Sequence, residues 1–413
     1  MCENCAFFFF FFRLKWICKI KYPCVILLWR WIKMKKKYIT FSIVTLVLLV
    51  AFITSFNYFK TTNTYVENNS NNQTKITKGI SMNLEQTAGA GDYKTVTRSS
   101  WPTEGYKFNA ELSRCENGST LSWDDTKKAV IVSGNLSDKC YVYFDIYQPT
   151  LAEYIKSQYT GTQGDNGIYY HNSTLANGAG DNSYRYAGAS DSVNNYICLG
   201  SDAATCPDAN LFRIIGVFGN QTKVIRAKSV GDKQWHTSQV NTWSSSSLNT
   251  YLNGEYLTSL GTLKNKIATT TWKVGGGSWS NIVNSVPKTV YQYEVGSSAS
   301  TTTVDKKIGL MYVTDYYYSA SPSAWTLVGF DNDATKDYRA AKTTNWLYLG
   351  SYEWTISRFS DTAISVFGVS STGFVSGYDV TNSYAVRPSF NLESSVKYVS
   401  GSGSMSDPVR VTD

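Results

Sequence analysis

The chain has 413 residues, a formal net charge of +8 and an aromatic content of 15%. The positive charge lies near the N-terminus: ten Lys and Arg residues precede residue 61 against one acid, Glu3, whereas the remainder carries 29 basic and 30 acidic residues. A nearly neutral remainder lacks the basic surface that nucleic acids require, so we expect no nucleic-acid partner.

The first 33 residues show neither helical nor strand periodicity, and they include a Phe7–Phe12 homopolymer. Met34 is followed by three lysines and an apolar run, which resembles a natural start. We therefore interpret residues 1–33 as a misassigned N-terminal extension. A short cytoplasmic, membrane-associated tail is the alternative.

The apolar run from Tyr38 to Phe59 contains no charged residue and is long enough to cross a bilayer as a helix, which takes about 20 residues. Positive charge beside a span stays on the cytoplasmic side, and Lys35–Lys37 precede this one. Large side chains continue to the end of the run, unlike the small residues before a signal-peptide cleavage site. The pattern predicts a signal-anchor helix over residues 34–59, with the C-terminal domains outside the cell.

A polar, Asn- and Thr-rich tract at residues 60–79 is typical of a flexible stalk. Beyond it, residues 106–112 and 140–146 alternate apolar and polar side chains, which is the period of half-buried strands. Residues 121–132 predict a hairpin with its turn at Asp124–Lys127. We expect a small β-sandwich-like domain over residues 80–147.

Four cysteines follow the apolar run, namely Cys115, Cys140, Cys198 and Cys206. An even number of cysteines in an extracellular setting indicates disulfides, and four cysteines allow three connectivities. We favour Cys115–Cys140 and Cys198–Cys206, because each pair falls within one local segment. No Cys-x-x-Cys spacing occurs among the four, and we predict neither a metal nor a cofactor.

Residues 148–413 mix short helices and strands. Thr150–Ile155 opens an amphipathic helix, and residues 211–218 and 222–227 form a strong hairpin signal across Gly219–Gln221. Ser245 or Ser246 begins a second helix with apolar residues at helical spacing. Strands with few, segregated helices predict an α+β domain.

The second domain resembles an uncharacterised domain family found in surface proteins of Firmicutes and related bacteria. The resemblance spans about Leu151–Val411, and the segments that carry it are LFRIIGVF (Leu211–Phe218), NTWSSSSLNTYLN (Asn241–Asn253), EWTISRF (Glu353–Phe359) and SYAVRPSFNL (Ser383–Leu392). That family is remotely similar to the C-type-lectin-like fold shared with formylglycine-generating enzymes, which implies a lectin-like α+β domain here. Those enzymes rely on late reactive cysteines, and this chain has none after Cys206.

Trp354, Arg358 and Arg387 are the candidate ligand-binding residues. An arginine beside aromatic rings stacks on or clamps a ligand; internal pairing and packing is the more common role of such residues. The aromatic residues Tyr316–Tyr318 and Trp325 form a second candidate, a binding platform.

Other motifs carry less weight. Asp331–Asp337 has alternating oxygen donors like a calcium loop, but it lacks the glycine and the distal glutamate of such loops, so an ordinary turn is favoured.

No complete catalytic motif occurs. We therefore predict a membrane-anchored extracellular binding or adhesion module, not an enzyme, with a glycan or a surface protein as its ligand. An envelope hydrolase with paired carboxylates and a purely structural surface protein are the alternatives.

Overall fold

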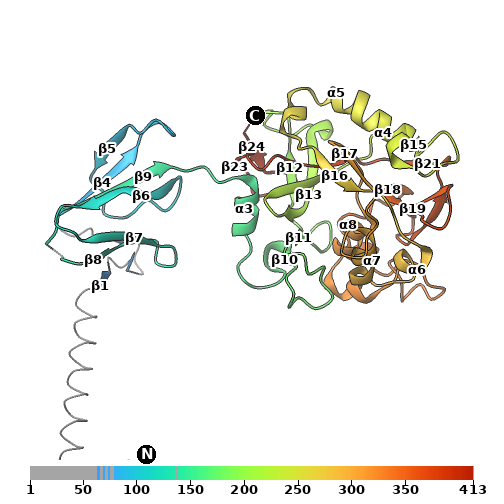
Figure 1. Cartoon of the computed structure of the whole chain (residues 1–413), viewed down its shortest axis with the longest axis horizontal. Coiled ribbons are helices and arrows are strands. Elements are labelled where there is room, and N and C mark those ends of the chain that lie inside the picture. The colour runs from blue at the N-terminus through green and yellow to red at the C-terminus, as the bar shows by residue number, and fades with distance from the viewer. Residues whose placement is uncertain (1–62, 66–67, 70–72, 75–78, 136, 413) are drawn as a thin grey trace, which may run out of the picture. The chain divides into compact units, whose positions relative to one another are not determined.

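The structure is a computed structural model. It describes residues 63–65, 68–69, 73–74, 79–135 and 137–412 (Figure 1). The predicted extension, anchor and most of the stalk lie outside these residues. Within the described part, no helix is long and apolar enough to cross a membrane. The chain divides into two compact units, Met1–Tyr147 and Gln148–Asp413.

The N-terminal unit contains a four-stranded and a three-stranded sheet, with strand orders β5-β4-β9-β6 and β1-β8-β7. Strands β4 and β9 run parallel, and the other neighbours in these two sheets run antiparallel. A further short pair joins β2 to β3. The strands are β1 (Asn63–Tyr65), β2 (Asn68–Asn69), β3 (Gln73–Thr74), β4 (Ile80–Glu85), β5 (Tyr93–Val96), β6 (Tyr106–Cys115), β7 (Thr120–Asp124), β8 (Ala129–Ser133) and β9 (Cys140–Ile146).

A small apolar core holds the two sheets together. Met82 and Phe144 from the four-stranded sheet and Val130 from the three-stranded sheet are buried in one cluster. The Trp123 ring meets Phe144 edge-on at 5.7 Å between centroids. Burial follows the alternation of the sequence along β9, but on β6 a register shift between Asn109 and Arg114 leaves Ala110 and Leu112 exposed. The predicted strands and hairpin are confirmed.

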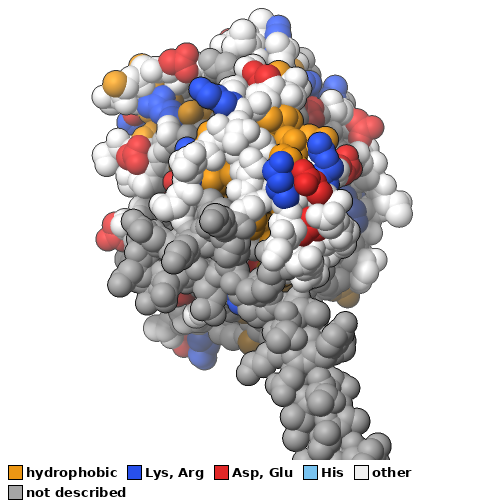
Figure 2. Space-filling view, turned by 90° about the vertical axis from the view of Figure 1, so that its left-hand side faces the viewer, with side chains coloured by type: hydrophobic (Ala, Val, Ile, Leu, Met, Phe, Trp, Pro, Cys, Tyr) orange, Lys and Arg blue, Asp and Glu red, His pale blue; other side chains and the backbone are white. Residues whose placement is uncertain are grey.

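Most charged side chains described in the N-terminal unit lie at its surface, whereas the carboxylates of Glu85 and Asp138 are buried and accept hydrogen bonds. Ion pairs at this surface include Lys128–Asp125 and Lys139–Glu116, whose side chains are all about half exposed or more. On the face drawn in Figure 2, basic and acidic side chains lie interspersed with hydrophobic ones. Such mixed charge is typical of a solvated surface.

Both predicted disulfides are present. Cys115 on β6 lies directly opposite Cys140 on β9, and their bridge links the two strands. Cys198 and Cys206 are bridged across eight residues in the C-terminal unit. Pairing the cysteines that are close in sequence therefore predicted the correct one of the three possible disulfide connectivities.

The C-terminal unit is built on two larger sheets. The first has the order β10-β11-β13-β14-β22, with β12 also paired to β13, and the second has the order β15-β21-β18-β19-β20. Two further antiparallel pairs, β16–β17 and β23–β24, complete the strands. The bounds are β10 (Ile168–Tyr170), β11 (Tyr184–Tyr186), β12 (Tyr196–Cys198), β13 (Leu211–Phe218), β14 (Gln221–Arg226), β15 (Asp232–Gln234), β16 (Thr270–Lys273), β17 (Thr303–Lys306), β18 (Glu353–Arg358), β19 (Ser365–Val369), β20 (Val375–Asp379), β21 (Ser383–Ala385), β22 (Ser389–Asn391), β23 (Tyr398–Ser400) and β24 (Arg410–Val411).

Short helices cover these sheets, and their starts follow local chemistry. Thr150 and Glu153 form a capping box before α3, and the Ser246 side chain accepts from the Asn249 amide at 3.0 Å to cap α4. Helix α4 continues through a π turn, Leu252–Tyr256, into α5, so the second predicted helix is confirmed. The helices are α3 (Leu151–Ser157), α4 (Ser247–Tyr251), α5 (Leu257–Ser259), α6 (Trp279–Ile282), α7 (Pro287–Glu294) and α8 (Val313–Tyr318).

The predicted fold class is wrong. Strand accounts for 33% of the structure and helix for 18%, so the part of the chain that the structure describes is mostly β rather than the α+β that we expected. The membrane helix expected over residues 34–59 lies outside the described residues. The helices predicted from the sequence are present, but each one is short. Strand β13 lies deep in the core, with seven consecutive residues buried.

Candidate functional site

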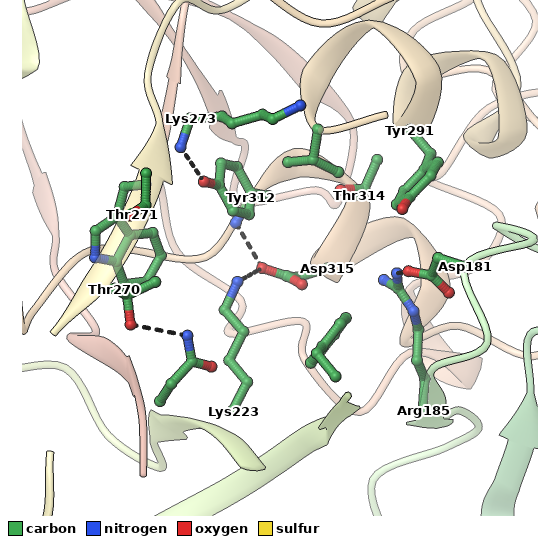
Figure 3. Close-up of a pocket in the computed structure, with 14 residues that line it drawn as sticks. Asp181, Arg185, Lys223, Thr270, Thr271, Lys273, Tyr291, Tyr312, Thr314 and Asp315 are labelled. Atoms are coloured by element: carbon green, nitrogen blue, oxygen red, sulfur yellow. Dashed lines mark hydrogen bonds and ion pairs between the residues drawn. The ribbon is translucent and has the colours of Figure 1, made fainter. Parts of the chain in front are cut away.

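A cavity of about 260 Å³ lies in the C-terminal unit, between the six-stranded sheet, the β16–β17 pair and helices α7 and α8 (Figure 3). Two other cavities, of about 330 and 410 Å³, are larger, but their linings contain no aromatic ring. The first cavity is lined by five charged side chains and four aromatic rings, namely Asp181, Arg185, Lys223, Lys273, Asp315, Phe218, Trp272, Tyr291 and Tyr312.

A buried ion pair joins Lys223 on β14 to Asp315 on α8. The Lys223 Nζ lies 2.6 Å from Asp315 Oδ2, and the two side chains are 6% and 3% exposed. Asp315 Oδ2 also accepts the backbone N–H of Tyr312 at 2.7 Å, which fixes the carboxylate at the start of α8. Burial lowers the pKa of Lys223, and the charge of Asp315 opposes that effect. An unpaired lysine would be costly here, so the pair holds both charges in the cavity wall.

A second ion pair, Arg185–Asp181, forms another part of the wall, as Figure 3 shows. Arg185 Nη2 donates to Asp181 Oδ2 at 2.6 Å. Ser183 ties the pair together, because its hydroxyl donates to Asp181 Oδ1 and accepts from Arg185 Nε. Burial raises the pKa of Asp181, but the Arg185 charge and the Ser183 hydrogen bonds outweigh it and lower that pKa to about 2. Asp181 is therefore an ionised acceptor at neutral pH.

Aromatic rings surround both cations. Lys223 Nζ lies 4.5 Å from the Tyr312 ring centroid and 5.2 Å from that of Trp272. Arg185 Cζ lies 4.7 Å from the Phe218 ring centroid. These contacts are within the range of cation–π attraction and exclude water from the charged groups.

Glu294, at the end of α7, holds the segment that carries Asp315. Its carboxylate accepts the backbone N–H groups of Val313 and Thr314 at 2.9 and 2.8 Å, together with the Thr314 and Ser357 hydroxyls. Burial raises the pKa of Glu294, and the hydrogen bonds from Ser357 and Thr314 oppose the rise. Glu294 does not line the cavity, so it acts as a support for the wall.

Lys273, at the end of β16, is the cavity-lining cation with no carboxylate partner among the described residues. Its Nζ donates to the Gly296 carbonyl at 3.2 Å. Its backbone N–H donates to the Tyr312 hydroxyl at 2.9 Å, which fixes the start of the side chain beside the aromatic wall. The five charged groups of the lining therefore sum to one excess positive charge, carried by Lys273.

The structure places the residues expected to bind a ligand elsewhere, and none of the three lines this cavity. Trp354 is fully buried in β18, where its Nε1 donates to the Lys233 carbonyl. Arg358 Nε donates to the Gly275 carbonyl at 2.9 Å. Arg387 is 3% exposed and is paired with Glu353 at 2.7 Å. The contacts seen for these residues are internal.

The expected aromatic platform is also buried. Tyr316, Tyr317, Tyr318 and Trp325 are each at most 1% exposed, so they contribute to the core rather than to a binding surface. Their position on α8 and on the turn after it explains this, because every residue of α8 is buried.

The Asp331–Asp337 segment is a self-bonded turn. Asp333 accepts from the Thr335 amide and hydroxyl, and Asp337 pairs with Arg339. Across the residues that the structure describes, no group of three or more His, Cys, Asp or Glu side chains is arranged to hold a metal ion.

Sequence reasoning missed the charged residues of the cavity. A signal for them exists: Lys223 directly precedes the apolar pair Val224–Ile225 of β14, and Asp315 directly precedes three tyrosines on α8. Single charges in buried segments are rare unless they are paired. Such positions mark either structural ion pairs or functional sites, and the pattern alone does not say which residues meet.

Fold and cavity together define a disulfide-bonded, mostly β protein whose C-terminal unit holds a charged, aromatic-walled cavity. Residues 219–394 match the sequence profile of a domain of unknown function (DUF6273). No curated protein and no solved structure matches the chain. The match includes Lys223 and Asp315, whereas Asp181 and Arg185 precede it. A relation to an uncharacterised domain family is thus shown, without evidence for a lectin-like relative or a bacterial source.

Proposed function

We propose that the C-terminal unit is a non-enzymatic binding module that takes a small saccharide in the cavity beside Lys223 and Arg185. The observation that carries this proposal is the combination of aromatic rings and ionised hydrogen-bonding groups around one cavity of about 260 Å³. Sugar rings present apolar C–H faces to aromatic walls, and their hydroxyls bond to charged donors and acceptors. Small-molecule sites combine these features, with a few polar groups fixing orientation.

The pKa of Asp181 favours binding over hydrolysis. Asp181 and Asp315 both line the cavity, as a two-carboxylate glycosidase would require. Such an enzyme needs one carboxyl group protonated near neutral pH, with a raised pKa. The pKa of Asp181 is instead lowered to about 2, and Asp315 is paired with Lys223. We therefore prefer a binding role to catalysis.

We also propose that the protein works outside the cytoplasm. Two disulfides support this setting, because disulfides persist in oxidising compartments and are rare in the cytosol.

Binding is tested with the full chain on an array of neutral and acidic mono- and disaccharides, followed by calorimetry on the hits. We expect saturable binding that Phe218→Ala weakens about tenfold or more, since aromatic contacts of this kind are worth about 1–3 kcal/mol. Phe330→Ala, at an aromatic contact outside the cavity, is the control and should bind as the parent does.

Saturable binding without product release supports a binding module. Release of a shorter or hydrolysed sugar from the hits would instead identify a hydrolase. Absence of binding to every sugar by a folded chain would overturn the saccharide proposal.

A further inference from the structure

We infer that the saccharide is a sugar acid whose carboxylate binds Arg185, an inference that rests on the function proposed above. Arg185 is 2% exposed and lines the cavity. Its Nε and Nη2 donate to Ser183 and Asp181, whereas Nη1 has no hydrogen-bond partner among the described residues. Figure 3 shows the guanidinium end of Arg185 at the cavity beside Asp181. Nη1 is not among the buried side-chain atoms that lack a partner, so its N–H groups reach the cavity and are able to donate to a ligand there.

Position and rigidity suit Arg185 to this role. The Phe218 and Tyr318 rings lie 4.7 and 5.0 Å from its Cζ atom, and Ser183 and Asp181 fix the remaining edge of the guanidinium. A guanidinium held in one orientation loses little entropy when a carboxylate binds it. Charge-assisted hydrogen bonds of this kind are about twice as strong as neutral ones.

The charge balance of the cavity points the same way. Asp315 compensates Lys223 and Asp181 compensates Arg185, so the charge of Lys273 is left over. Lys273 is half-buried, and its Nζ makes a hydrogen bond to a carbonyl rather than an ion pair. A neutral sugar would leave this excess charge uncompensated in an aromatic-walled cavity. A ligand with one negative charge would neutralise it.

Asp315 provides an acceptor for a sugar hydroxyl in another part of the cavity wall. Lys223 and the Tyr312 amide both donate to Oδ2 of Asp315. Oδ1 of Asp315 has no hydrogen-bond partner within the described part of the chain, so it is available to accept a ring hydroxyl. The cavity therefore offers cationic donors on the Arg185 side and a carboxylate acceptor on the Asp315 side. This polarity matches a sugar ring with hydroxyls at one end and a carboxylate at the other.

Matched sugar pairs test the inference directly. D-Glucuronate is compared with D-glucose, and D-galacturonate with D-galactose, by calorimetry with the full chain at low and high salt. We expect the acid of each pair to bind about tenfold or more tightly, which is the worth of one charge-assisted hydrogen bond. The preference should shrink as salt is raised, because Lys273 is partly solvated.

Variants separate the charge effect from the fold. Lys273→Gln should reduce the acid-over-neutral ratio severalfold, because it removes the excess positive charge of the cavity lining. Lys306→Gln lies on the paired strand β17 and outside the cavity lining, so it serves as the matched control. Arg185→Lys should abolish the preference. Circular dichroism of each variant shows whether it is folded, and Lys273→Gln keeps the test valid if Arg185→Lys does not fold.

The outcomes distinguish this inference from the function on which it rests. Equal or tighter binding of the neutral sugars, unaffected by Lys273→Gln, would overturn the sugar-acid inference and leave saccharide binding intact. No binding of either sugar class by the folded chain would overturn both.

Discussion

The two units of this chain differ in whether they bury ion pairs. In the N-terminal unit the core is a small apolar cluster, and the Lys139–Glu116 pair is 57% and 48% exposed. In the C-terminal unit a far larger core encloses ion pairs such as Lys223–Asp315, which is 6% and 3% exposed. Burying a charge pair costs several kcal/mol per ion before the attraction is recovered. The larger core of the C-terminal unit encloses such pairs, and two of them, Lys223–Asp315 and Arg185–Asp181, line the cavity.

The largest expected effect comes from breaking the buried pair. Asp315→Ala leaves Lys223 without a countercharge among aromatic rings, and we expect the C-terminal unit to lose about 3–5 kcal/mol of unfolding free energy. Chemical denaturation followed by tryptophan fluorescence measures the loss. Because Lys228–Asp208 has the same 2.6 Å separation but is exposed, Asp208→Ala is the matched control and should leave stability unchanged. If Asp315→Ala and Asp208→Ala lost the same unfolding free energy, the buried pair would contribute no more to stability than the exposed pair.

The N-terminal unit should depend instead on its disulfide. Replacing Cys115 and Cys140 by alanine removes a bridge that closes 25 residues, and the expected loss is about 3 kcal/mol from the unfolded-state entropy alone. A unit with so small a core should then unfold at a much lower temperature, while the C-terminal transition stays in place. Calorimetry would resolve the two transitions. A downward shift of both would show that the units do not melt independently.

A smaller effect is expected from acid. The pKa of Asp181 is lowered from 3.8 to about 2 in the folded state, so this group stabilises the fold above about pH 4, and that contribution disappears as the pH falls through 2. The expected size is about 2 kcal/mol. Asp181→Asn should flatten the stability profile between pH 4 and 2. A variant profile parallel to that of the parent would argue against a lowered pKa at Asp181.

Local features of the fold were predictable because their causes lie within a few residues. The alternation at residues 106–112 and 140–146 marks β6 and β9, and the Thr150–Glu153 capping box marks the start of α3. The two disulfides were predictable for the same reason, because each joins cysteines of one local segment. In each case the interaction that fixes the structure joins neighbours along the chain.

The cavity was not predictable for the complementary reason. Lys223 and Asp315 are 92 residues apart, and Asp181 and Arg185 come from a third region of the chain. Periodicity reports which face of an element is buried, but not which elements meet. It also could not show that Arg387 is neutralised by Glu353, 34 residues away, instead of being free to bind a ligand. The predicted fold class was wrong because the prediction gave the short helices as much weight as the sheets that they cover.

The position of β13 and β11 in the six-stranded sheet has a practical consequence for anyone who expresses part of this protein. A fragment cut at residues 219–394 would omit both strands, since they end at Phe218 and Tyr186. Its β14 would then become an open edge with unpaired backbone groups, a geometry that promotes aggregation. It would also lack the arginine of the cavity. Fragment boundaries should therefore follow the compact unit that begins at Gln148 rather than the limits of sequence similarity.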